Sequence, residues 1–186
     1  MLTARTLAEA QIYLSVITAA DLDAPAVEPP LPEPGENLTE GPDAWTLSTP
    51  VGELTILYAS EDAARRVGAR FGLGVSSLVD AAQWAVVAGT YGRRALEADL
   101  AYHGRPDEDR EAVELNWEFA ADAVGEALKF LPDAANEAPD AAVWTEFGAE
   151  AIVDDPQLLT RAKLTDDLEY YRGTLEDFRA LYDKSS

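Results

Sequence analysis

Residues 164–182 read LTDDLEYYRGTLEDFRALY, and their large apolar side chains recur at spacings of 4, 3, 4, 3 and 4. Such a seam of nearly three heptads predicts a long helix that packs on another helix. Asp155 and Pro156 suit an N-cap and a first helical position, so we expect the helix to run from there to Asp183. Gly173 lies off the seam and marks a point for a break. The seam consists of Leu164, Leu168, Tyr171, Leu175, Phe178 and Tyr182.

The segments before this helix also show helical periodicity. A helix is expected from Asp107 or Glu108 to just before Pro132, and shorter helices over 141–152 and over 61–71, the latter capped by Ser60. Another long helix is expected from Ser76 or Ser77 to about Tyr102. The apolar seam of the helix before Pro132 comprises Val113, Trp117, Ala120, Val124, Ala127 and Leu131.

The first 60 residues predict three different structures in succession. Residues 1–20 read as a helix, about 3–20, whose apolar stripe is Leu7, Ala10, Leu14 and Ile17. Residues 21–43 carry six prolines and seven acids, which predicts an extended arm rather than a helix. The runs 45–47 and 54–58 then predict a small β-hairpin. The expected fold is mainly α: a single domain with a hairpin and helical bundle over 44–186, plus the N-terminal helix and the acidic arm.

The charge is the strongest compositional feature. The chain holds 35 acids and 14 bases, of which only three are lysines, for a net charge of −21. A field of this sign repels nucleic acid and anionic membranes. Two explanations stay open: a surface adapted to high intracellular salt, which the scarcity of lysine favours, or an acidic face for a basic partner.

Catalytic signals are weak. The chain has no cysteine and one histidine, His103, in a turn, so a serine triad or a histidine-rich metal site is not expected. Two acid pairs, Glu111 with Glu114 and Glu137 with Asp140, have the spacing of magnesium-dependent helical pyrophosphatases, but Pro139 interrupts the second pair. We therefore predict no enzyme activity, no cofactor and no metal site.

A helix-turn-helix pattern spans 64–83, with Gly72 at the turn and a recognition helix beginning near Val75. That helix would carry no lysine or arginine to contact phosphate or guanine. An ordinary corner between two helices is the favoured interpretation, and sequence-specific nucleic-acid binding is not predicted.

These observations predict a non-catalytic assembly subunit that acts through protein–protein contacts in a larger complex, as a homo-oligomer. The most specific hypothesis is a head–tail connector of a tailed virus with a halophilic host, in the cytoplasm or the virion. The alternatives are an acidic inhibitor or immunity-type protein, and a helix-turn-helix regulator. The apolar anchors expected to meet other subunits are Val27, Leu31 and Leu38 of the arm, together with the seam Leu164, Leu168, Tyr171, Leu175, Phe178 and Tyr182. No membrane contact is predicted.

Overall fold

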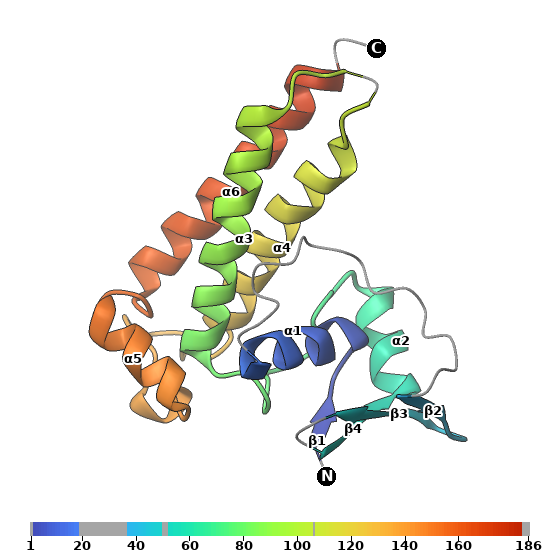
Figure 1. Cartoon of the computed structure of the whole chain (residues 1–186). Helices are drawn as coiled ribbons and strands as arrows, with labels where there is room; N and C mark the ends of the chain where they lie inside the picture. The colour runs from blue at the N-terminus through green and yellow to red at the C-terminus, as the bar shows by residue number, and fades with distance from the viewer. Residues whose placement is uncertain (1, 19–36, 50–51, 106, 184–186) are drawn as a thin grey trace. The chain divides into compact units, whose positions relative to one another are not determined.

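The computed structural model describes residues 2–18, 37–49, 52–105 and 107–183. These form two compact units: the first holds the described residues up to Val79, and the second begins at Asp80. Over the described residues the fold is mainly helical, with six α-helices and a four-stranded mixed sheet (Figure 1). The expected anchors Val27 and Leu31 lie outside the described residues.

The first unit is built on the sheet, whose strand order is β1-β4-β3-β2. The predicted strand pair forms its centre, where β3 (Ala44–Thr49) runs antiparallel to β4 (Gly52–Leu57). On one side β1 (Leu2–Ala4) adds in parallel to β4, and on the other β2 (Leu38–Glu40) adds antiparallel to β3. The two strands that the sequence predicted thus lie in the middle of a larger sheet.

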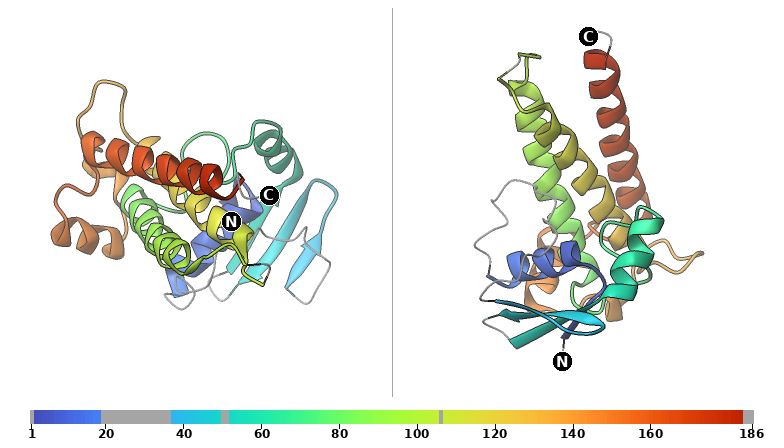
Figure 2. Two further views of the ribbon diagram at one scale, coloured as in Figure 1. Left: turned by 90° about the horizontal axis from the view of Figure 1, so that it is seen from above. Right: turned by 90° about the vertical axis from the view of Figure 1, so that its right-hand side faces the viewer.

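Two helices of the first unit, α1 (Leu7–Thr18) and α2 (Tyr58–Arg66), lie on the same face of this sheet (Figure 2). Side chains alternate across a strand, and in β4 Leu54 and Ile56 are fully buried while Leu57 is exposed. The face of β4 that carries Leu54 and Ile56 is therefore the apolar face that the two helices cover.

The predicted start of the first helix is wrong, because residues 2–4 pair with β4 and α1 begins only at Leu7. Of the expected stripe only Ala10 is buried, whereas Ile17 is exposed. The helix instead turns Glu9 inward, where Arg5 binds it: the Arg5 backbone N–H lies 2.6 Å from Oε2, and its Nε lies 2.9 Å from Oε1. Because Arg5 compensates the charge of Glu9, α1 can bury this acid. The buried face of α1 therefore differs from the one that hydrophobicity predicts.

The C-terminal end of the expected acidic arm belongs to the sheet of its own unit. Leu38 pairs with Leu47 across β2 and β3 and is partly buried. The expectation that the whole segment 21–43 extends away from its own domain is therefore wrong for residues 38–40.

The predicted helix-turn-helix corner does not form. The first helix ends at Arg66 rather than 71 and is not capped by Ser60, whose hydroxyl donates to the Leu57 carbonyl. No helix is assigned between 67 and 80, so a recognition helix from Val75 is absent. The Ser76 hydroxyl accepts from the backbone N–H groups of Leu78 and Val79, and this turn replaces the expected helix start.

The second unit is a set of helices in which α3 (Ala81–Ala101), α4 (Arg110–Leu128) and α6 (Arg161–Asp183) lie side by side (Figure 1). A 3₁₀ turn, η1 (Asp140–Ala142), and the short helix α5 (Glu146–Asp154) connect α4 to α6, so the expected helix over 141–152 is shorter and starts later. The predicted seam before Pro132 is confirmed, since all six of its residues are buried: Val113, Trp117, Ala120, Val124, Ala127 and Leu131.

The seam of α6 also packs inside its own unit. Leu164, Tyr171, Leu175 and Phe178 are buried, and the Tyr171 ring lies 6.0 Å from that of Trp117 on α4. Leu168 and Tyr182 are partly buried, and the Tyr182 ring lies 4.7 Å from that of Tyr102. Four of the six seam residues are therefore buried within their own unit. The helix begins at Arg161 rather than Pro156 and continues unbroken through Gly173.

Candidate partner-binding surface

The segment that joins α4 to α6 has an unusual charge. Residues 133–160 contain seven acids and no lysine, arginine or histidine. This segment includes η1 and α5, and we call its exposed side the α5 surface. Its acids are Asp133, Glu137, Asp140, Glu146, Glu150, Asp154 and Asp155.

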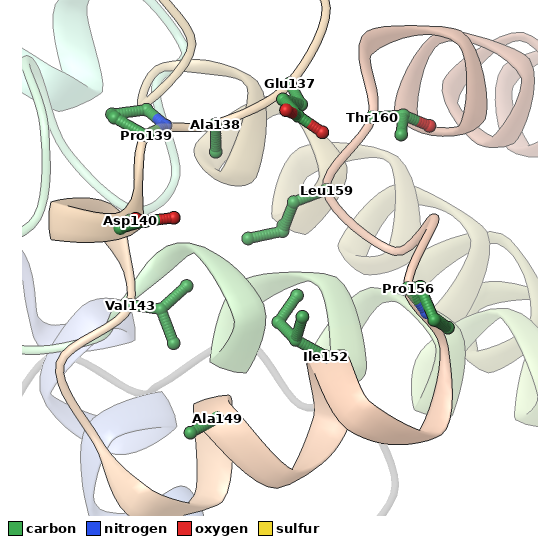
Figure 3. A pocket seen from close by; sticks show the side chains of 10 residues that line it. All are labelled: Glu137, Ala138, Pro139, Asp140, Val143, Ala149, Ile152, Pro156, Leu159 and Thr160. Carbon is green, nitrogen blue, oxygen red and sulfur yellow. The ribbon is translucent and has the colours of Figure 1, made fainter.

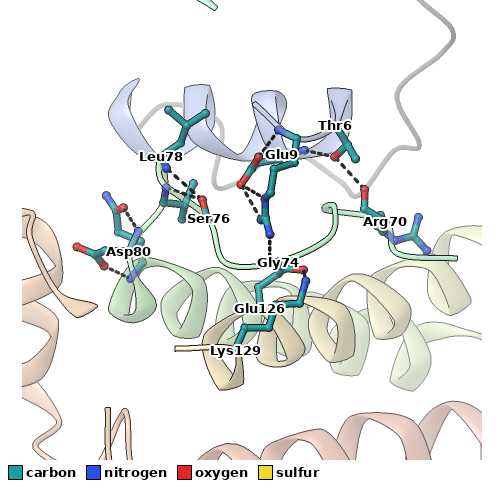
Figure 4. Close-up of polar contacts among 12 residues, drawn as sticks. Thr6, Glu9, Arg70, Gly74, Ser76, Leu78, Asp80, Glu126 and Lys129 are labelled. Carbon is teal, nitrogen blue, oxygen red and sulfur yellow. Dashed lines mark hydrogen bonds and ion pairs between the residues drawn. The ribbon is translucent and has the colours of Figure 1, made fainter. Parts of the chain in front are cut away.

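One side of the α5 surface is fixed by Asp80, the N-cap of α3. Its Oδ1 accepts from the Gln83 backbone N–H at 2.8 Å, and the Gln83 side chain accepts in return from the Asp80 N–H (Figure 4). Its Oδ2 accepts from the Thr145 N–H at 3.0 Å, the Thr145 hydroxyl at 2.6 Å and the Trp144 N–H at 3.2 Å. Asp80 is fully buried, so these donors supply the hydrogen bonds that water would otherwise provide.

The Asp80 contacts set the start of α5. The Thr145 hydroxyl that donates to Asp80 also accepts from the Gly148 N–H at 3.0 Å and so caps the helix. A Cβ on Gly148 would lie 2.6 Å from Asp80 Oδ2, so this close approach requires glycine. A single buried carboxylate therefore ties the N-terminus of α3 to that of α5.

The other side of the α5 surface is fixed by Arg161, the first residue of α6. Its side chain donates to the carbonyls of Ala135 at 2.8 Å and Pro132 at 2.7 Å, and its backbone N–H donates to Asn136. The Ala138 N–H donates to the Leu159 carbonyl at 3.1 Å. The loop after α4 is thus attached to the start of α6.

Between these attachments lies a hollow of about 360 Å³. The apolar side chains of Val143, Ile152 and Leu159 point into it (Figure 3). The carboxyl-bearing residues Glu137 and Asp140 also line it. This hollow therefore combines an apolar interior with two acids.

A second hollow of about 390 Å³ lies on α5 and is lined by Glu146, Ala149, Glu150, Val153 and Asp154. The two hollows share Ala149, whose small side chain is exposed. A chain that bridges both hollows would cross α5 at this small residue.

Large apolar side chains are exposed beside the hollows. Trp144 is 48% exposed, Phe147 37% and Val153 78%. Aromatic side chains of this kind supply much of the affinity in protein interfaces. Five carboxylates accompany them and have no hydrogen bond or ion pair within the described part of the chain: Glu137, Asp140, Glu146, Glu150 and Asp154.

Of the acids that the sequence raised as metal ligands, Glu114 takes part in ion pairs instead. Both oxygens of Glu114 are bound by arginines, Oε1 by Arg110 at 2.7 Å and Oε2 by Arg179 at 2.6 Å. Burial acts to raise the pKa of Glu114, but the hydrogen bonds from the two arginines lower it overall. No cluster of three or more His, Asp or Glu suited to a metal occurs among the residues that the structure describes.

His103 lies in the turn between α3 and α4 and is largely exposed, with Nδ1 3.5 Å from Glu108 Oε1. Glu108 organises this turn, because its Oε2 accepts from the backbone N–H groups of Arg105 at 2.9 Å and His103 at 2.7 Å. The hydrogen bond from the Arg105 N–H is the largest cause that lowers the pKa of Glu108 to about 2. These contacts give the region a structural role.

Sequence reasoning named none of Trp144, Phe147, Ala149 or Val153 as site residues. The available signal was the run of 28 residues, 133–160, with seven acids and no base. Nothing in the order of those residues shows that the loop and α5 enclose hollows, since that depends on distant contacts with Asp80 and Arg161.

Comparison of the chain with protein-family models, curated proteins and solved structures gave no match. Among the described helices, none combines the length and the apolar character needed to cross a membrane.

Proposed function

We propose that this chain is a non-catalytic binding protein that captures a basic partner protein on the α5 surface. The observation that carries the proposal is the absence of any base among residues 133–160 beside exposed Trp144 and Phe147. A partner with lysines or arginines on an apolar face would complement both the charge and the exposed apolar side chains.

The acids of this surface contribute little to the fold of the chain itself. Glu150 and Asp154 are exposed and have no partner in the described structure, so at low salt they repel their acidic neighbours. A basic partner would remove this repulsion when it binds. Steering by the whole field would also speed its association.

This proposal keeps the general function expected from the sequence, a role in protein–protein contacts, and favours the inhibitor-type alternative over the connector. The connector hypothesis depended on a free helical seam and on the arm. Leu164 and Leu175 of that seam are buried in their own unit, and Leu38 lies in the sheet, so these residues do not support it.

The test is binding of a fluorescein-labelled amphipathic peptide of leucine, alanine and arginine, followed by anisotropy at about 0.15 M salt. The peptide is expected to bind the full chain, whereas a peptide with glutamate in place of arginine is not. The variant Glu150→Lys with Asp154→Lys should weaken binding by about tenfold or more, because it reverses charge on the α5 surface.

The matched control is Glu169→Lys with Glu176→Lys, which changes the net charge equally at exposed positions of α6. It should retain most of the affinity. Equal losses in the two variants would mean that the peptide responds only to net charge, and absence of binding to the unmodified chain would also contradict the proposal. Circular dichroism of both variants checks that the helices are intact.

A further inference from the structure

The hollow of about 360 Å³ has the features of a receptor for one long side chain. Small-molecule sites occupy roughly 300–1,000 Å³, so this one is at the small end of that range. Among its lining side chains, the apolar Val143, Ile152 and Leu159 point into it (Figure 3). An apolar interior of this kind suits the methylene stem of a lysine or arginine, whose charged end needs a polar partner.

The polar partners come from two separate positions on the wall. Glu137 precedes Pro139 and forms an isolated bridge with Thr160, while Asp140 begins η1. Their carboxylates have no partner within the described residues. Residues 133–160 also supply no base that could neutralise them. A cation in the hollow could therefore reach two carboxylates.

Two carboxylates from different directions favour arginine over lysine. A guanidinium group has five N–H donors in one plane and is weakly hydrated, whereas an ammonium group is a compact, strongly hydrated point charge. The planar group can donate to both acids and place its face against apolar side chains such as Ile152. A lysine ammonium group also has donors for both acids, but it is more strongly hydrated and has no planar face to place against the apolar side chains.

Hydrogen bonds within the chain hold the segments that form the walls of the hollow. The Ala138 N–H donates to the Leu159 carbonyl, and Arg161 holds the carbonyls of Pro132 and Ala135. On the opposite side Asp80 holds Trp144 and Thr145. Preformed walls reduce the ordering cost of binding, which is the main obstacle to affinity in a small site.

We infer that this hollow accepts an arginine side chain of the basic partner, with Glu137 and Asp140 as its acceptors. The inference rests on the proposed function and names the side chain that the α5 surface selects. The second hollow, at Glu146 and Val153, is not required for it.

The experiment follows the methyl NMR signals of Val143, Ile152 and Leu159 in the full chain during titration with Nα-acetyl-arginine methylamide. Saturable shifts of these methyl groups are expected. The lysine derivative should bind at least about threefold more weakly, because it lacks the planar fork of donors. The norleucine derivative, which has no cation, should produce no saturable shift.

The variant Glu137→Gln with Asp140→Asn should abolish the saturable shifts and leave the remaining methyl spectrum unchanged. A matched control, Glu169→Gln with Glu176→Gln on α6, should leave the titration intact. Equal responses to arginine and lysine, or a response to norleucine, would overturn the inference.

The two experiments together distinguish failure of the arginine site from failure of the proposed function. If the arginine derivative leaves these methyl groups unshifted but the basic peptide still loses affinity on charge reversal at Glu150 and Asp154, only the arginine site is wrong. If the peptide does not bind at all, the proposed function is wrong as well.

Discussion

Two regions of the second unit use their acids in opposite ways. Between α4 and α6, acids are matched by arginines: Arg179 donates to Glu114 and Glu118, each at 2.6 Å, and Arg110 donates to Glu114 at 2.7 Å and Asp183 at 2.6 Å. On the α5 surface, the carboxylates of Glu137, Asp140, Glu146, Glu150 and Asp154 have no partner within the described structure. The net charge of −21 does not reveal this difference, which is seen in the contacts of the individual acids.

The comparison indicates that acids near α5 are not part of the interactions that hold the helices together. The exception is Asp80, which lies beneath the α5 surface and contributes no exposed charge. The fold therefore needs the buried acid and the paired acids, while the exposed acids of α5 are available to a partner.

The largest loss of stability is expected from Asp80→Ala. It would leave the N–H groups of Gln83, Trp144 and Thr145 and the Thr145 hydroxyl without their acceptor. Loss of a buried charged acceptor with several donors costs about 3–5 kcal/mol in the free energy of unfolding. Urea denaturation followed by tryptophan fluorescence measures it. Asp80→Asn, which keeps one acceptor oxygen, should cost less, and a loss below about 1 kcal/mol for alanine would contradict the assigned role.

The two regions differ in how well the sequence predicts their structure. The helices α4 and α6 were predicted well because their seams repeat at helical spacing over many residues, as with Val113 and Trp117. The segment from η1 through α5 was predicted poorly, because its shape depends on contacts with Asp80, 64 and 65 residues away, and on Arg161. Periodicity carries no information about such contacts.

The first unit illustrates a second limit. Strand β1 has only three residues, and its identity depends on parallel pairing with β4, about 50 residues later. Its sequence, Leu2-Thr3-Ala4, is equally consistent with the start of a helix. Glu9 lies off the expected apolar stripe, and an acid is rarely buried unless it is paired. The stripe alone does not reveal that Arg5 binds Glu9 and that Glu9 is buried.

A smaller loss of stability is expected from Arg179→Met on the paired side of the comparison. The substitution keeps an unbranched stem but removes the donors to Glu114 and Glu118. Because the arginine side chain is 40% exposed, solvent screening limits the cost to about 1 kcal/mol. A double-mutant cycle with Glu114→Gln in chemical denaturation measures the coupling. A coupling energy of zero would show that the ion pairs do not hold α4 to α6.

The turn between α3 and α4 gives a prediction on pH. The Glu108 pKa is lowered from 4.5 to about 2, so its carboxylate stabilises the fold above pH 4.5, and the contribution is lost as the pH falls toward 2. Glu108→Gln should therefore lower the Tm at pH 7, and the difference from the unmodified chain should shrink steadily below pH 4.5. Melting curves followed by circular dichroism test this. A difference that is independent of pH would contradict it.

The smallest change in stability is expected on the α5 surface. Glu150→Gln with Asp154→Asn should alter the free energy of unfolding by no more than about 0.5 kcal/mol at low salt, with a stabilising sign, because two like charges are removed. In molar salt the difference should vanish. Thermal melts at low and high salt measure it. A clear loss of stability would mean that these acids support the fold and are not reserved for a partner.

The same melts bear on the origin of the overall charge. If the acidity is an adaptation to high salt, the unmodified chain should become more stable from about 0.1 M to molar salt, since screening weakens self-repulsion. Unchanged or lower stability in molar salt would favour a specific acidic face.

The most direct test of the central claim is site-specific photo-crosslinking to the basic amphipathic peptide. A benzophenone amino acid replaces either Phe147, which is 37% exposed on α5, or Tyr170, which is 52% exposed on α6. Both positions are aromatic and accessible, so they differ in location rather than in chemistry. We expect a crosslink from position 147 that excess unlabelled peptide abolishes, and little or none from position 170. Equal crosslinking at the two positions, or crosslinking only at 170, would contradict the assignment of the α5 surface as the binding site.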